Sequence, residues 1–235
     1  MALALVPLLA GCAAQQAMAP ALVGKPQISS RVKPVLTVDG LRFRDLDDDG
    51  ALPQFEDWRL DEERRASDLL ARMTVEEKAG TPLHATMPSA GAQLGRGDGY
   101  DRNALTAMVT GSHITSLITR LGTARADVAA ENNAAQEIAE GARIAIPLTI
   151  SSDPRNHFLY VLGASESAMG TTQWPELLGF AALGDGERMH RFGDVARAEY
   201  RAVGIHMALS PQLDLFTEPR WPLGGGADRA CRPPR

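Results

Sequence analysis

The chain has 235 residues, of which 44 % are hydrophobic and 23 % charged, a balance typical of a globular protein with one large domain or two small ones. A net charge of −5 and the lack of a basic cluster argue against a nucleic-acid partner. The two cysteines, Cys12 and Cys231, lie near opposite ends and offer neither metal-site spacing nor a disulfide framework.

The first residues are apolar and end in Leu9-Ala-Gly-Cys12, which resembles a bacterial lipoprotein signal whose cysteine carries the lipid. The apolar stretch is too short to span a bilayer as a helix. We therefore expect a signal over residues 1–12, a tether over 13–40, and membrane contact only through a lipid anchor on Cys12. The protein would then be periplasmic, an outer-membrane lipoprotein or secreted. No Lys or Arg precedes the apolar run, so a mildly apolar leader without lipid is the alternative.

An acidic segment follows at residues 45–56, with the spacing of a calcium loop. Oxygen-bearing side chains occupy its first, third, fifth and twelfth positions, and a glycine that permits a sharp turn occupies the sixth: Asp45, Asp47, Asp49, Glu56 and Gly50. Calcium is therefore a candidate ligand, and no other cofactor is expected. The segment 35–43 has an extended pattern, so the entering helix of an EF-hand is missing, and an acidic turn leading into the next helix is the alternative.

Helical and strand-like patterns alternate along the rest of the chain. Helical periodicity covers Glu62 to Met73, with its apolar face at Ala66, Leu69 and Leu70, and covers Ala124 to Arg143 and residues 189–203. Thr74 and Glu77 have the spacing of a capping box. Strands are expected within 81–88, 114–121, 146–151 and 205–210. This alternation predicts an α/β protein with a parallel sheet or barrel.

Polar residues follow two of these strands. Asp153 and His157 come after the strand at 146–151, and Arg220 follows the strand at 205–210. In parallel α/β folds, ligands bind at the carboxyl ends of the strands, so these residues predict a site for a polar, hydroxyl-rich ligand. The alternatives are a turn-forming Asp153, an Arg220 paired with Glu218, and a His157 that only bonds its loop.

Other residues carry weaker signals. No Ser, His and Asp set can be assembled, and the remaining histidines lack metal spacing. Trp174 and Trp221 could stack on a sugar or fill the core, and Glu176 and Glu199 are candidate acids.

The pattern resembles the amino-terminal domain of family 3 glycoside hydrolases, the bacterial β-glucosidase group. The blocks that carry the resemblance are Phe43 to Gly50, Glu56 to Arg59, Asp68 to Gly80, Ile146 to Phe158, Gln173 to Glu176 and Glu218 to Trp221. The resemblance implies a (β/α)8 TIM barrel, of which residues 41–221 would form roughly the first half. It also implies retaining hydrolysis, with two carboxyl groups about 5–5.5 Å apart.

Matched by position, Asp153 resembles the family's carboxylate that grips the terminal sugar, and Arg220 resembles its sugar-binding arginine. The resemblance implies that the family's nucleophile and acid/base come from positions beyond the end of this chain, so no catalytic residue is assigned. Residues 222–235 depart from the family's pattern and are rich in Pro, Gly and Arg, which suggests a frameshift near codon 222.

We therefore expect the amino-terminal part of a β-glucosidase-like enzyme, inactive alone, whose substrate is a β-linked oligosaccharide or aryl glucoside. The alternative is a non-catalytic calcium- or carbohydrate-binding lipoprotein fragment.

Overall fold

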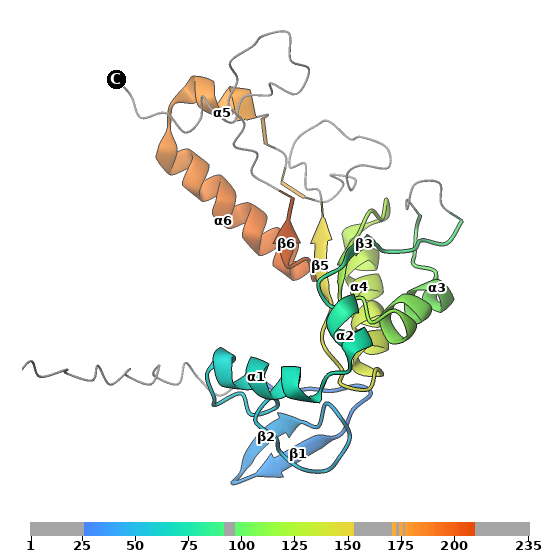
Figure 1. Ribbon diagram of the computed structural model, residues 1–235. Coiled ribbons are helices and arrows are strands. Elements are labelled where there is room, and N and C mark those ends of the chain that lie inside the picture. Colours follow the sequence, from blue (N-terminus) through green and yellow to red (C-terminus); the bar gives the residue numbers. More distant parts are fainter. Residues whose placement is uncertain (1–25, 92–96, 153–170, 173, 176, 210–235) are drawn as a thin grey trace, which may run out of the picture.

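The computed structural model describes residues 26–91, 97–152, 171–172, 174–175 and 177–209 (Figure 1). Its first element is an antiparallel hairpin of β1 (Val35–Val38) and β2 (Leu41–Arg44), in which Val35 lies opposite Arg44. Asp39 and Gly40 make the turn with φ of 52° and 73°, a conformation that glycine adopts without strain. The hairpin and α1 (Glu62–Arg72) lie together at one end of the molecule.

The segment before the hairpin belongs with the folded part. The Arg31 guanidinium forms an ion pair with Glu137, and the Ser30 hydroxyl bonds Glu140; both acids lie on α4 (Arg125–Glu140). The predicted boundary between tether and domain, at residues 40 and 41, falls at the turn of the hairpin. Residues 30–38 are therefore structured, while Cys12 lies outside the described residues.

Helix α1 begins where the Asp61 carboxylate accepts the backbone N–H of Arg64, an N-cap. The helix was predicted, but its apolar face is less buried than expected. Leu70 is 54 % exposed, and no residue of α1 is buried. The apolar period thus located the helix without showing what covers it.

Helix α2 (Val75–Gly80) contains the predicted capping box. Thr74 accepts the N–H of Glu77 at 3.3 Å, and Glu77 accepts the N–H of Thr74 at 2.8 Å. Glu77 also pairs with the Arg143 guanidinium, whose Nε lies 2.9 Å from Oε1. This buried carboxylate therefore ties α2 to the segment after α4, and the Arg143 hydrogen bonds lower its pKa.

Replacing Glu77 tests this tie. Glu77→Ala is expected to cost about 2–3 kcal/mol, because it removes a cap and a charge-assisted pair. Since the folded-state pKa lies below the ordinary value of 4.5, the stability from the pair is present above that pH and is lost as pH falls through the lowered pKa. The free energies of unfolding of wild type and Glu77→Gln, measured with urea, should therefore differ less at pH 3 than at pH 7. Glu187→Gln, an exposed acid in the first turn of α6 (Gly186–Ala202), is the control. A difference that grew in acid would contradict the assignment.

The main sheet is parallel, with the order β3 (His84–Thr86), β4 (Ser116–Ile118), β5 (Thr149–Ser152) and β6 (Met207–Ala208). All four strands fall within the predicted segments, except that β5 extends one residue further, and neighbours in sequence are neighbours in the sheet. Helices occupy the crossovers: α3 (Arg102–Thr106) with the π-helical turn η1 (Ala107–Gly111), then α4, then α5 (Leu177–Leu183) with α6. The predicted parallel α/β architecture is confirmed, and its closure into a barrel stays a prediction.

The core lies on one face of this sheet. Leu117 of β4 and Ile150 of β5 are buried against Val128 and Ala135 of α4. Successive side chains of a strand point to opposite faces, so the neighbours of Leu117 and Ile150 along each strand point away from this core. None of the helices in the described ranges is long and apolar enough to cross a membrane.

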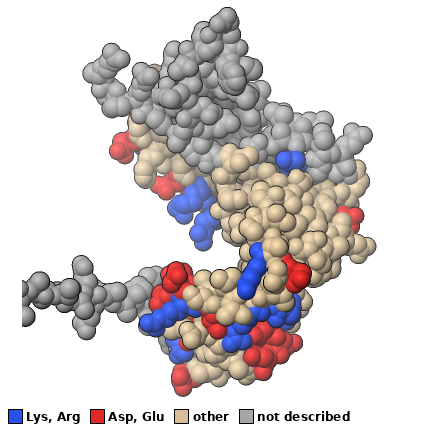
Figure 2. All heavy atoms as spheres, in the orientation of Figure 1, with Lys and Arg blue, Asp and Glu red and all other residues tan. Residues whose placement is uncertain are grey.

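Charged side chains gather over the hairpin and α1 on the face shown in Figure 2, where both signs are mixed. Several are paired locally, including Asp57 with Arg59 and Asp68 with Arg72.

Candidate functional site

Strands β5 and β6 deliver two polar segments to the same edge of the sheet. The strands pair in parallel, with Ser151 opposite Met207 and Ser152 opposite Ala208. The residues expected to bind sugar, Asp153, His157 and Arg220, lie outside the described residues. The parallel pairing places the carboxyl ends of β5 and β6, at Ser152 and Ala208, side by side. The structure thus shows the two strands as neighbours, and the site that Asp153, His157 and Arg220 would form stays a prediction.

Two further polar residues occupy this edge, and neither was predicted from the sequence as a site residue. Arg120 comes two residues after β4, and its Nε is buried without a hydrogen-bond partner. Ser152 is the last residue of β5 and is fully buried, and its Oγ also lacks a hydrogen-bond partner. A buried polar atom is costly without a partner, so such atoms at a strand edge are suited to a polar ligand. Arg120 lies inside the predicted strand segment 114–121, and a charge near the end of that segment was its only sequence signal.

A buried polar network lies near this edge. The Tyr100 hydroxyl lies 2.6 Å from Oγ1 of Thr119, directly after β4, and donates to Oδ1 of Asn132 at 2.7 Å. The Asn132 amide donates to the Val203 carbonyl at 2.7 Å. The network therefore joins the end of β4 to α4 and to the turn before β6. Asn132 lies four residues after the apolar Val128 in the helix predicted over Ala124 to Arg143, and that spacing was its only sequence signal.

The face of the sheet opposite the core carries a row of hydrogen bonds. His84 Nδ1 lies 2.7 Å from the Ser116 hydroxyl, and Nε2 lies 3.0 Å from that of Ser151. Because hydroxyls occupy both ring nitrogens, no carboxylate orients this imidazole as a triad requires. The row therefore links three strands and provides no activated serine.

Trp174 and Glu199 have structural contacts. The Trp174 ring packs on Phe180 and Phe192, with centroids 5.9 and 5.4 Å away. Glu199 accepts the backbone N–H of Thr172 at 2.8 Å. Of the two interpretations of Trp174, the structure supports the core role.

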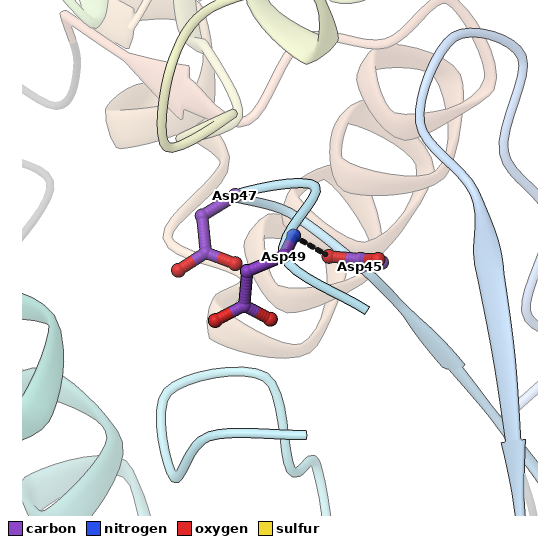
Figure 3. Close-up of side chains that lie close together, drawn as sticks. All are labelled: Asp45, Asp47 and Asp49. Carbon is purple, nitrogen blue, oxygen red and sulfur yellow. Dashed lines mark hydrogen bonds between the residues drawn. The ribbon is translucent and has the colours of Figure 1, made fainter. Parts of the chain in front are cut away.

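The acidic loop brings three of its four predicted metal ligands together (Figure 3). One oxygen each from Asp45, Asp47 and Asp49 lies within 4.8 Å of the others. Glu56 does not belong to this convergent set, but its Oε1 accepts the N–H groups of Leu46 and Asp47. Burial raises the pKa of Glu56 to about 7, although the two N–H groups oppose that effect.

Comparison with known proteins identifies the family to which the chain belongs. The family model described as the glycosyl hydrolase family 3 N terminal domain matches residues 86–228, more than half of the chain. The chain belongs to glycoside hydrolase family 3. The family match begins at the end of β3, so it covers the strand edge and not the acidic loop.

Curated relatives agree with the family 3 assignment. The chain is 52 % identical over 196 residues to the "Periplasmic beta-glucosidase/beta-xylosidase" of Dickeya chrysanthemi, a match that covers 83 % of this chain and 30 % of the relative. It is 41 % identical over 175 residues to the "Probable beta-glucosidase C" of Aspergillus flavus, covering 74 % of this chain and 27 % of the relative. "Beta-glucosidase C" of Emericella nidulans is 42 % identical over 175 residues, covering 73 % and 27 %. The chain thus spans less than a third of the length of each of these proteins.

Proposed function

We propose that this chain supplies the sugar-gripping part of a retaining β-glycosidase that removes terminal β-linked sugars, as glucosides or xylosides. The names of the family 3 relatives support the substrate class. The single observation that carries the proposal is the parallel pairing of β5 with β6. It places side by side the carboxyl ends of the two strands that precede Asp153 and Arg220 in the sequence, which supports a shared site for the two side chains.

The chemistry of the three residues suits a terminal sugar. A carboxylate such as Asp153 accepts hydrogen bonds from two hydroxyls, and a guanidinium such as Arg220 donates two in a fixed fork. His157 adds a donor or an acceptor according to its tautomer. These side chains bind and orient the ring without breaking a bond.

The catalytic carboxylates are proposed to come from elsewhere. Retaining glycosidases need two carboxyl groups about 5–5.5 Å apart. In the described part of the chain, β3, β4 and β6 are directly followed by Met87, Thr119 and Leu209, none of which is an acid. We therefore propose that the chain alone binds sugar without hydrolysing it.

The proposed location is the periplasm, with Cys12 as a lipid anchor. The name of the Dickeya relative supports the compartment, and the Leu-Ala-Gly-Cys ending supports the anchor.

Two measurements on the purified protein test this function. Saturation-transfer NMR with methyl β-D-glucoside should show contact that Asp153→Asn abolishes and that exposed Asp127→Asn does not. Release of nitrophenol from p-nitrophenyl β-D-glucoside should stay at the buffer rate. Enzymatic release that Asp153→Asn abolished would show that the chain holds its own catalytic acids. Absence of any sugar contact would contradict the binding role.

A second candidate function is binding of carbohydrate or calcium without any catalytic partner. The absence of an acid directly after three of the four described strands favours it. A chimera that joins this chain to the remainder of a family relative separates the two candidates. Hydrolysis by the chimera supports the glycosidase function, and a folded chimera without activity supports the non-catalytic one.

A further inference from the structure

The acidic loop lies away from the strand edge and before the family match, so the proposed glycosidase function does not use it. Its backbone is wound tightly between β2 and α1. Asp48 and Gly50 have φ of 62° and 74°, and the N–H of Asp45 donates to the Pro34 carbonyl. Asp45 is 2 % exposed, and its two oxygens accept the N–H groups of Asp49 and Gly50, each at 3.0 Å. The loop is therefore held by its own hydrogen bonds, with the Asp45 carboxylate turned inward.

The distances suit one ion. Two oxygens that are each 2.3–2.6 Å from a calcium ion can be at most about 4.6–5.2 Å apart. The convergent oxygens of Asp45, Asp47 and Asp49 lie within 4.8 Å of one another, so a single ion can touch all three. Each carboxylate oxygen has two lone pairs, so the N–H bonds to Asp45 leave room for a cation.

The loop's own charges are poorly balanced. Among the described residues, Arg72 is the one cationic side chain within ion-pair distance of the four acids, at 3.5 Å from Asp47. Arg72 is shared, since its Nε also lies 3.2 Å from Asp68 and its guanidinium stacks on Phe55. Burial, with the charge of Asp49, raises the pKa of Asp47.

Two buried oxygens point independently to a missing partner. Glu56 is 4 % exposed, and its Oε2 is buried with no hydrogen-bond partner. Oδ1 of Asp47 is also buried with no hydrogen-bond partner. The N–H of Asp47 lies 3.2 Å from Oε1 of Glu56, which places this carboxylate against the loop. A buried carboxylate oxygen without a donor is costly, and a cation removes that cost.

We propose that the loop from Asp45 to Glu56 binds one calcium ion through Asp45, Asp47 and Asp49, with Glu56 as the fourth protein ligand. All donors are hard oxygens, and calcium accepts an irregular arrangement of such ligands more readily than magnesium does. The loop follows a strand, β2, and Glu56 lies in a turn, so the site is not a helix-loop-helix. Its role is structural, because the ion joins the hairpin to the segment that leads into α1.

Calorimetric titration of the EDTA-treated protein with CaCl₂, together with thermal unfolding, tests the site. We expect one ion per chain and a rise in Tm of about 5–10 °C when free calcium is near 100 times Kd. Glu56→Gln and Asp49→Asn should each weaken binding at least tenfold and reduce the rise in Tm. Asp49 is exposed, so its variant leaves the buried part of the loop intact. Glu63→Gln, an exposed acid in the first turn of α1, is the matched control and should behave as wild type.

Three results would overturn the proposal. The first is no heat and no change in Tm up to about 10 mM calcium, roughly ten times the Kd of about 1 mM that marks the weakest protein calcium sites. The second is binding that both loop variants leave unchanged, which would place the ion elsewhere. The third is an equal rise in Tm with MgCl₂, which would overturn the assignment to calcium.

Discussion

Asp153→Ala is expected to reduce kcat/KM for p-nitrophenyl β-D-glucoside about 10²–10³-fold in a chimera of this chain with its Dickeya relative. The chimera carries this chain in place of the 196 matching residues, which are 52 % identical. A charged carboxylate contributes about 1.5–3 kcal/mol per hydrogen bond, and Asp153 is proposed to hold two sugar hydroxyls. A loss of 3–4 kcal/mol corresponds to that reduction in rate.

The control for the chimera is Asp194→Ala, which removes the same carboxylate from α6. Asp194 has a side chain 58 % exposed, and among the described residues its ion-pair partners, His190 and Arg197, belong to its own helix, so its loss should leave the rate unchanged. An active chimera that tolerates Asp153→Ala would refute the sugar-gripping role. A folded chimera without activity would favour the non-catalytic function.

Asn132→Ala is expected to destabilise the protein by about 2–4 kcal/mol. Asn132 is 1 % exposed, and its amide bridges the Tyr100 hydroxyl and the Val203 carbonyl. Its removal takes one partner from each of two groups near the sheet edge, and buried groups that lose a partner cost about 1–3 kcal/mol each. Urea unfolding, followed by circular dichroism, measures the change.

The neighbouring Asn133→Ala provides the matched control. Asn133 occupies the next position of α4 and is exposed, so the same substitution should change stability by less than about 0.5 kcal/mol. Equal losses in the two variants would refute a specific role of the buried network, since Ala has a higher helix propensity than Asn and the substitution costs nothing by itself.

The sequence predicted most of the architecture because its elements have strong local signals. The capping box at Thr74 is a local contact, and the structure contains both of its hydrogen bonds. The four strands were predicted from short apolar runs, and their parallel pairing follows from the helices between them. The period of α1 was equally clear, yet Leu70 is exposed, because a helical period cannot say what covers the face.

Some residues of the candidate sites could be predicted from the sequence, and others could not. Asp45, Asp47 and Asp49 could be grouped from spacing alone, since a tight loop must bring alternate side chains together. Arg120 and Asn132 could not be singled out, because their importance depends on burial and on partners up to 71 residues away.

By itself, the amino-acid sequence determined the family, the parallel α/β class and the acidic loop, all of which depend on residue type and short spacing. Only the tertiary structure decided that Ser30 and Arg31 join α4, that Trp174 packs on Phe180 and Phe192, and that Glu56 keeps a buried oxygen without a partner. These features depend on which distant groups exclude water from one another, and no local pattern encodes that information.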